Sequence, residues 1–188
     1  PADFALVLEG ESSTLRSSPS LYARYDRSSP ATSPCDVRRT VLNYIGGDAW
    51  RDAGQWIEWD FDVPEDGLYA ITLKVQQNND AGMPSYRQIM VDGEIPFDEL
   101  RLYPFPYSDQ WYAETLHGAD GEPYLFHLTK GTHTLTMTVK LGAIGEIMTR
   151  TEADTAYLSE IHREIVKITG TDPDYNYEYD LYRTMPGL

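Results

Sequence analysis

The stretch GQWIEWDFDVPEDGLYAITLKVQ, residues 54–76, decides the fold class. Apolar side chains alternate with polar or small ones on both sides of a Pro-Glu-Asp-Gly turn, at Ile57, Trp59, Phe61 and Val63 before it and at Tyr69, Ile71, Leu73 and Val75 after it. Period-two alternation around a Pro/Gly turn predicts two half-buried antiparallel strands. We therefore expect a hairpin that places Trp59 in the core and Trp56 on the polar face.

Shorter patterns predict the remaining strands. Residues 4–11 and 37–45 are expected to be strands, and 86–91 is expected to be a strand closed by the turn pair Asp92-Gly93. Another strand is expected at 111–116, and residues 124–128 and 132–141 are expected to form a second hairpin. Residues 12–34 are rich in Ser and Pro, which is typical of a loop, here an ordered excursion across the sandwich surface.

The spacing of the apolar residues changes near the C-terminus. Apolar residues repeat at intervals of three and four, at Leu158, Ile161, Ile165 and Ile168, which predicts an amphipathic helix. Thr151 with Asp154 resembles a capping box at one possible start, Ile144 and Ile147 allow an earlier start, and Gly170 is a good stop. The fold class predicted is mainly β: an antiparallel jelly-roll β-sandwich over residues 1–142, then a C-terminal helix and Tyr-rich extension over 143–188 that packs on the sandwich or on a following domain.

The composition excludes several classes of partner and of site. The chain has 188 residues, with 30 acidic and 15 basic side chains and a net charge of −15, which argues against nucleic acid as a partner. The single cysteine, Cys35, excludes an internal disulfide and a Cys-based zinc cluster. No apolar run approaches the roughly 20 residues of a membrane span, and no signal segment is visible. The abrupt start and end suggest a module of a longer protein.

No motif of a known catalytic centre occurs in the sequence. A glycosidase would need two carboxylates across a cleft, and a sequence does not reveal such a pair. His127 and His133 flank the turn of the second predicted hairpin and could meet as a metal pair, but no third ligand is identifiable nearby. We therefore expect a non-enzyme in which these histidines are structural.

The loops that connect the predicted strands carry the candidate ligand site. Planar rings beside amides and charges are what a sugar site needs, because rings stack on the C–H face of a sugar while polar groups bind its hydroxyls. The candidate ligand-binding residues are Trp50, Arg51, Asn78, Asn79, Asp80, Tyr86 and Arg87. The alternative is that Trp50 covers the core and Arg87 is a structural ion-pair partner.

The candidate metal ligands are Glu9 and Glu11. Two residues apart on a predicted strand end, their carboxylates would point to the same face. Together with other oxygen ligands they could hold Ca²⁺, which needs six to eight of them. The alternative is a solvated acidic edge.

With these residues in view, the chain resembles the jelly-roll carbohydrate-binding modules of the galactose-binding-like superfamily, especially families 6 and 35. The opening LEGE resembles their acidic first strand, residues 54–69 resemble their core motif, and LTKGTHTLTM resembles their late hairpin, in which the Gly-x-His step is structural. The resemblance implies that Glu9 and Glu11 match the acidic positions at which these families hold calcium. After Leu141 the chain departs from them, because it becomes helical where they supply a final strand.

Over most of its length the chain is also similar to an accessory domain of large extracellular solute-binding proteins of Gram-positive ABC transporters. The stretches IGGDAW…GQWIEWDF, GEPYLFHLTKGTHTL and ITGTDPD carry this second resemblance. It implies an exported, cell-surface location and neighbouring domains outside this fragment. The function expected is a non-catalytic carbohydrate-binding-like module that takes an oligo- or polysaccharide. The alternatives are a structural or docking domain with no small ligand and, third, a glycoside hydrolase.

Overall fold

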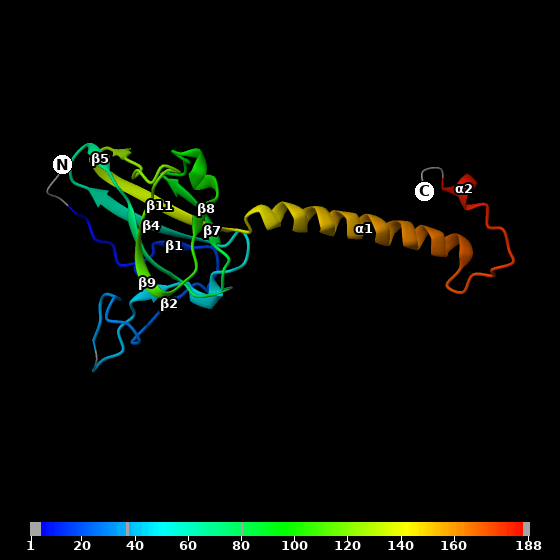
Figure 1. The fold of residues 1–188 in the computed structure, drawn as a ribbon, viewed down its shortest axis with the longest axis horizontal. Coiled ribbons are helices and arrows are strands. Elements are labelled where there is room, and N and C mark those ends of the chain that lie inside the picture. Colours follow the sequence, from blue (N-terminus) through cyan, green and yellow to red (C-terminus); the bar gives the residue numbers. More distant parts are fainter. Residues whose placement is uncertain (1–4, 37, 80, 186–188) are drawn as a thin grey trace. The chain divides into compact units, whose positions relative to one another are not determined.

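The computed structural model describes residues 5–36, 38–79 and 81–185. The chain divides into two compact units, a β-rich unit Pro1–Gly142 and a helical unit Ala143–Leu188 (Figure 1). The two units are described separately below.

The first unit is built on a five-stranded antiparallel sheet. Its order is β1 (Leu15–Arg16), β4 (Trp56–Val63), β11 (Gly131–Lys140), β7 (Ser85–Val91) and β8 (Tyr103–Phe105). Three two-stranded pairs complete the unit: β10 (Phe126–Leu128) with β5 (Gly67–Tyr69), β6 (Thr72–Gln77) with β9 (Ser108–Thr115), and β2 (Ala23–Arg24) with β3 (Tyr44–Ile45). Two short 3₁₀ turns, η1 (Gly47–Ala49) and η2 (Asp98–Arg101), lie in the connections.

The stretch 54–76 forms the predicted strands, but they do not pair as a hairpin. Strand β4 pairs with β11 along one edge and, at Ile57 and Glu58, with β1 on the other edge, while β5 and β6 belong to other strand pairs. The chain instead leaves the five-stranded sheet after Val63 and enters the β10–β5 pair at Gly67. The prediction of a hairpin was wrong because alternation shows which face of a strand is buried and does not show which strand lies beside it.

The second predicted hairpin is wrong for the same reason. Strand β10 pairs with β5, while β11 pairs with β4 and β7. The chain therefore passes directly between the five-stranded sheet and the β10–β5 pair after β4 and before β11, and these two connections lie side by side, since Val63 is opposite Gly131 and Gly67 is opposite Leu128. A bond from the Lys130 N–H to Asp66 Oδ1 (2.6 Å) joins the two connections.

The core is built from residues of the five-stranded sheet and of the strands and loops that pack against it. The buried apolar residues come from the five-stranded sheet, from the β10–β5 pair and from η2 and loops: Leu21, Ile57, Trp59, Val63, Ile89, Val91, Leu100, Tyr103, Phe105, Leu116, Phe126, Leu128, Leu135 and Met137. The predicted burial of Trp59 is confirmed. Trp56, one residue from the inward-facing Ile57, lies on the other face of β4 and is half-buried.

His133 fastens the Asp92-Gly93 turn to the core. Its Nδ1 lies 2.6 Å from Asp92 Oδ2 and its Nε2 lies 2.8 Å from the Thr129 carbonyl oxygen. Both partners only accept hydrogen bonds, so these contacts favour the imidazolium form, in which both ring nitrogens donate. These bonds, the one to Asp92 foremost, raise the pKa of His133. The expectation of a structural histidine is confirmed here, while His127 is exposed on β10.

Two predicted strands are largely absent from the described residues. Residues 5–9 form no strand, and Leu6, Val7 and Leu8 are exposed; Phe4 lies outside the described residues. Alternation alone cannot make a strand where no neighbour completes its hydrogen bonds. Of the predicted strand 37–45 only Tyr44–Ile45 pairs, and Val37 lies outside the described residues. The strands predicted at 86–91 and 111–116 are present as β7 and within β9.

The second unit is a long helix followed by an irregular tail. Helix α1 runs over Ala143–Thr169 and ends at Gly170, whose φ of +74° suits a glycine stop. Thr151 lies inside the helix and its hydroxyl donates to the Ile147 carbonyl oxygen, so the earlier of the two predicted starts is the one observed. A short helix, α2 (Leu181–Thr184), follows in the tail. In the part of the chain that the structure describes, no helix has the length and apolar character to cross a membrane.

The His133 contact predicts a pH-dependent stability. The pKa of His133 in the folded protein lies above the ordinary 6.5. The contribution of this contact to the free energy of unfolding is therefore full below pH 6.5 and is lost as the pH rises through the folded pKa. We expect His133→Gln to lower the free energy of unfolding by about 1–2 kcal/mol at pH 5.5, because it removes a charged hydrogen bond that is partly open to water. At pH 9 the loss should be smaller. Urea denaturation measures this. His127→Gln is the matched control, and a loss independent of pH would contradict an imidazolium.

Candidate functional site

Trp50, the first predicted sugar-stacking residue, is packed into the edge of the core. Its ring meets Trp59 edge-on, with centroids 6.4 Å apart. The Arg87 guanidinium carbon lies over the ring, 4.6 Å from its centroid. A Cβ on Gly46 would lie 2.9 Å from Trp50 Cε3, so only glycine lets the backbone approach this closely. Arg87 therefore covers one face of the Trp50 ring.

Arg87 is held by main-chain oxygens and a hydroxyl. Its guanidinium donates to Ser85 Oγ (2.6 Å), to the Tyr86 carbonyl (2.9 Å) and to the Trp50 carbonyl (3.0 Å). Among the described residues it has no carboxylate within ion-pair distance. Burial lowers the pKa of Arg87 to about 10. Arg87 thus closes the end of the core together with Trp50, without the ion pair that the alternative interpretation assumed.

The remaining predicted ligand residues do not join this pair. Tyr86 points to the opposite face of β7 from Arg87, and its ring stands over Gly142, where a Cβ would lie 2.5 Å from Tyr86 Cε2. Arg51 is exposed near η1. Asn78 and Asn79 are exposed in the loop after β6, and Asp80 lies outside the described residues. Among the six of these residues that the structure describes, the side chains shown in contact are those of Trp50 and Arg87, and Tyr86 meets Arg87 through its main-chain carbonyl.

A different set of planar and charged residues does converge, and we call it the Trp111 cluster: Tyr22, Arg24, Asp26, Tyr44 and Trp111. The Trp111 indole N–H, from β9, donates to Asp26 Oδ2 at 2.8 Å. Its ring meets the Tyr44 ring edge-on with centroids 5.9 Å apart. Tyr44 in turn pairs with Arg24 across β2 and β3.

Asp26 orients the indole and is itself held in place. Its Oδ1 accepts from the Ser28 N–H and hydroxyl (2.7 and 2.6 Å), and its own N–H donates to Asn43 Oδ1 (2.7 Å). Partial burial would raise the pKa of Asp26, but the bonds from Ser28 and Trp111 outweigh it and the net pKa is lowered. The carboxylate is therefore ionised at neutral pH and keeps the Trp111 ring in one orientation.

Arg24 gives the cluster an unsatisfied donor. Its Nε atom is buried and has no hydrogen-bond partner among the described residues. Its guanidinium carbon lies 5.0 Å from the centroid of the Tyr22 ring, which is 54% exposed. A buried donor without a partner costs about 1–3 kcal/mol, so such an atom points to an unseen acceptor. Arg87, by contrast, makes three hydrogen bonds with its guanidinium and has no atom of this kind among the described residues.

Sequence reasoning did not identify this cluster. The signal was present, because Tyr22, Arg24 and Asp26 occupy alternate positions inside a Ser/Pro-rich loop, which is an unusual place for that pattern. The partner was not visible, since Asp26 and Trp111 are 85 residues apart and no local pattern joins them.

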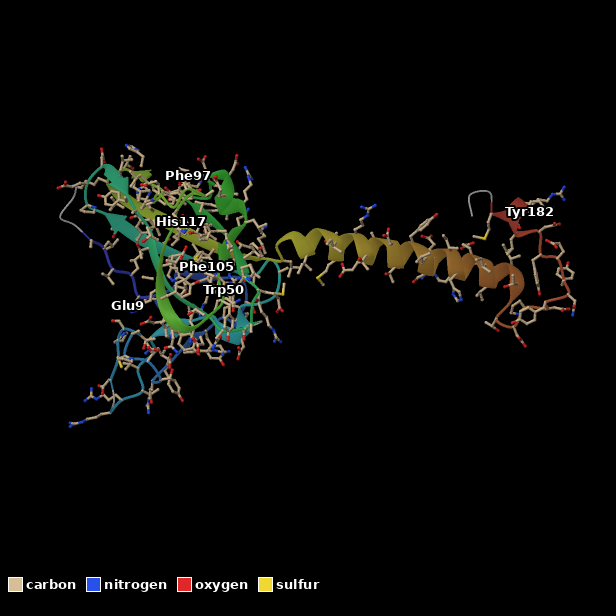
Figure 2. The ribbon with its side chains drawn as sticks, viewed as in Figure 1. Glu9, Trp50, Phe97, Phe105, His117 and Tyr182 are labelled. Atoms are coloured by element: carbon tan, nitrogen blue, oxygen red, sulfur yellow. The ribbon has the colours of Figure 1, made fainter. Side chains whose placement is uncertain are left out.

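Glu9 and Glu11 lie beside each other on an irregular segment. The Gly10 carbonyl between them accepts from the Trp59 indole N–H at 2.8 Å, which ties the segment to the core. One Glu11 oxygen, Oε2, is buried without a hydrogen-bond partner among the described residues. Burial, with the nearby Glu9 charge in addition, raises the pKa of Glu11. Figure 2 shows Glu9 and Trp50 at separate places on the first unit.

These two carboxylates are the side-chain donors at hand for a cation. Among the described residues, no group of three or more His, Cys, Asp or Glu side chains is arranged to hold a metal ion. Main-chain carbonyls and water would have to supply the remaining ligands, which is common for Ca²⁺.

A third polar group lies at the end of β9. The Tyr103 hydroxyl donates to Glu114 Oε1 (2.7 Å), and His117 Nε2 lies 3.4 Å from the same oxygen. Burial, and then the bond to Glu114, raise the pKa of Tyr103 well above its usual range. Tyr103 is buried in the core, so we interpret this group as a structural link between β8 and β9.

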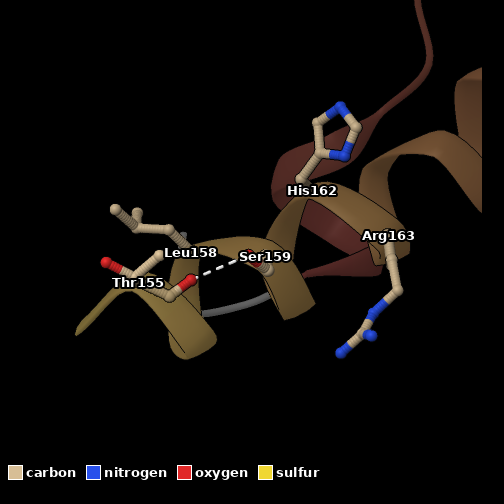
Figure 3. A pocket seen from close by; sticks show the side chains of 5 residues that line it. All are labelled: Thr155, Leu158, Ser159, His162 and Arg163. Atoms are coloured by element: carbon tan, nitrogen blue, oxygen red, sulfur yellow. Dashed lines mark hydrogen bonds between the residues drawn. The ribbon is translucent and has the colours of Figure 1, made fainter. Parts of the chain in front are cut away.

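The second unit has a shallow hollow on α1, lined by Thr155, Leu158, Ser159, His162 and Arg163 (Figure 3). Ser159 donates to the Thr155 carbonyl within the helix (2.8 Å). All five residues come from one helix. The hollow therefore describes the relief of a helix face and does not assemble a reactive group.

No protein-family model and no curated protein sequence matches the chain. Solved structures do resemble it. A cycloisomaltooligosaccharide glucanotransferase from Paenibacillus sp., solved with cycloisomaltoheptaose, is 23% identical with a TM-score of 0.51, over 72% of this chain and 16% of the enzyme. A family 35 carbohydrate-binding module from an environmental isolate is 13% identical with a TM-score of 0.46, over 72% of this chain and 82% of the module.

A family 35 module from Clostridium thermocellum is 16% identical with a TM-score of 0.44, over 63% of this chain and 76% of that module. At these identities the likeness concerns the fold alone. The predicted fold class, a mainly β antiparallel jelly-roll sandwich with a C-terminal helix, is confirmed. The chain spans about a sixth of the glucanotransferase.

Proposed function

We propose that the first unit is a non-catalytic carbohydrate-binding module and that the Trp111 cluster is its ligand site. The observation that carries the proposal is the Trp111 indole, which donates a hydrogen bond to the Asp26 carboxylate and meets the Tyr44 ring. Arg24, in the same cluster, has an Nε with no hydrogen-bond partner among the described residues. Rings offer stacking surface to the C–H face of a sugar, while Arg24 and Asp26 offer directional donors and acceptors for hydroxyls. The confirmed jelly-roll fold is compatible with this role.

The wider setting proposed is an extracellular, transport-associated protein of which this chain is one part. It rests on the resemblance of the sequence to accessory domains of extracellular solute-binding proteins. The acidic balance, 30 acidic against 15 basic residues, supports an uncharged partner over nucleic acid. The alternative of a docking domain is favoured by a specific observation on the second unit, namely large apolar side chains exposed along α1.

We further propose that Glu9 and Glu11 hold Ca²⁺. The residues fit the ion, because Glu11 Oε2, which is buried without a hydrogen-bond partner among the described residues, would gain a cation as its partner and the charge of the ion would offset the repulsion between the two carboxylates. When bound, the ion would supply positive charge and fix the segment that Gly10 ties to Trp59. It would have no part in chemistry on a sugar.

The sugar proposal predicts a selective loss of binding. Calorimetric titration with gluco-, isomalto-, xylo- and manno-oligosaccharides should find at least one ligand, and Trp111→Ala should weaken it at least tenfold, about 1.4 kcal/mol. Trp56→Ala, a half-buried tryptophan on the outer face of β4, is the matched control and should bind as the wild type does. Absence of binding by all four series, or equal loss in both variants, would refute the site. Release of reducing ends would refute the non-catalytic assignment.

The calcium proposal predicts stabilisation by the ion. With the millimolar to sub-millimolar affinity of extracellular modules, 10 mM Ca²⁺ should raise the free energy of unfolding by about 1.4–2.7 kcal/mol. Glu11→Gln should remove this gain, and the exposed Glu94→Gln should keep it. The raised pKa of Glu11 implies that the gain shrinks as the pH falls and the carboxyl protonates. An equal gain with Mg²⁺, or in Glu11→Gln, would show that the ion acts elsewhere.

A further inference from the structure

Helix α1 carries a continuous seam at heptad spacing. The seam consists of two series of positions, each with a spacing of seven residues. The first series is Ile144, Thr151, Leu158 and Ile165, and the second, three residues further along, is Ile147, Asp154, Ile161 and Ile168. We call this set the α1 seam. Spacing of this kind, sustained over three and a half heptads, is the pattern by which two helices pack along their length. The helix has 27 residues and is therefore about 40 Å long.

Large apolar side chains of the α1 seam are open to solvent. The exposed fractions are 46% at Ile144, 65% at Ile147 and 64% at Leu158. Ile161, Ile165 and Ile168 are half-buried. Six of the eight seam residues are thus apolar, and such a face on a helix this long marks an interaction surface. The hollow of Figure 3 adjoins it, with Leu158 on the α1 seam and Thr155 and His162 flanking it.

We propose that the α1 seam binds the α1 seam of a second copy of this chain, with the two helices antiparallel. In that orientation every seam residue finds a seam partner in one register: Ile144 faces Ile168, Ile147 faces Ile165, Thr151 faces Ile161 and Asp154 faces Leu158 of the second copy. The interface is two-fold symmetric and self-complementary, as closed dimers require.

The charges beside the α1 seam select this orientation. Arg150 and Glu164 occupy the flanking positions on one side of the seam, and in the antiparallel register Arg150 lies next to Glu164 of the second copy, twice by symmetry. In a parallel pair Arg150 would face Thr155 and Glu164 would face Thr169, so no ion pair would form across the interface. A parallel pair would also place the two Asp154 carboxylates opposite each other, which is repulsive.

The first test is the oligomeric state of the full 188-residue chain. Sedimentation velocity over a concentration series should show a concentration-dependent dimer, and Leu158→Glu should abolish it while far-UV circular dichroism remains unchanged. Ala156→Glu, exposed on the opposite face of the helix, is the matched control and should dimerise as the wild type does. A monomer at every concentration, as expected if a neighbouring domain of a longer protein covers the seam instead, would overturn the proposal.

The second test addresses orientation. Arg150→Glu and Glu164→Arg should each weaken the dimer about 2- to 30-fold, as two exposed ion pairs allow, and the double variant should recover the wild-type affinity. Glu164→Arg also breaks the pair with Lys167 on the same helix, so recovery in the double variant is the decisive result. Asp154→Leu should tighten the dimer. A dimer that the charge exchange leaves unrecovered, or that Asp154→Leu weakens, would contradict the antiparallel register.

Discussion

The antiparallel pairing of β4 with β11 is the constraint on which the first unit depends. It joins eight pairs of opposed residues, from Val63 with Gly131 to Thr138 with Trp56. At the Val63–Gly131 end of this ladder both chain segments leave the sheet. The two connections that do so carry β5 and β10 into the opposite layer, where they pair with each other and cover the core. Two adjacent connections at one end of this ladder therefore join the five-stranded sheet to the β10–β5 pair.

That constraint explains which parts of the fold could be predicted from the sequence. The alternation in residues 54–76 correctly predicts that Trp59 and Val63 are buried, because one apolar face must meet a core whichever strand lies beside it. It cannot predict the sheet to which each strand belongs, since a hairpin and a crossing between layers bury the same residues. Helix α1 was predictable in type and end, as its period and Gly170 are local features.

The candidate site could likewise be predicted only in part from the sequence. Residue types that could bind a sugar were recognised from the sequence, but their partners decide their roles. Trp50 and Arg87 satisfy each other at the end of the core. Arg24, in the Trp111 cluster, keeps a buried Nε donor that has no partner among the described residues. A contact between residues as far apart as Asp26 and Trp111 depends on tertiary packing and leaves no local trace.

The central claim is that Trp111 binds ligand and Trp50 is part of the core. The four tryptophans of the chain give four indole N–H signals in a ¹H–¹⁵N correlation spectrum, and single Trp→Phe variants would assign them. On titration with a bound oligosaccharide, the Trp111 signal should shift and saturate, and the Trp50 and Trp59 signals should stay in place. A saturating shift of the Trp50 signal with Trp111 unmoved would contradict this account.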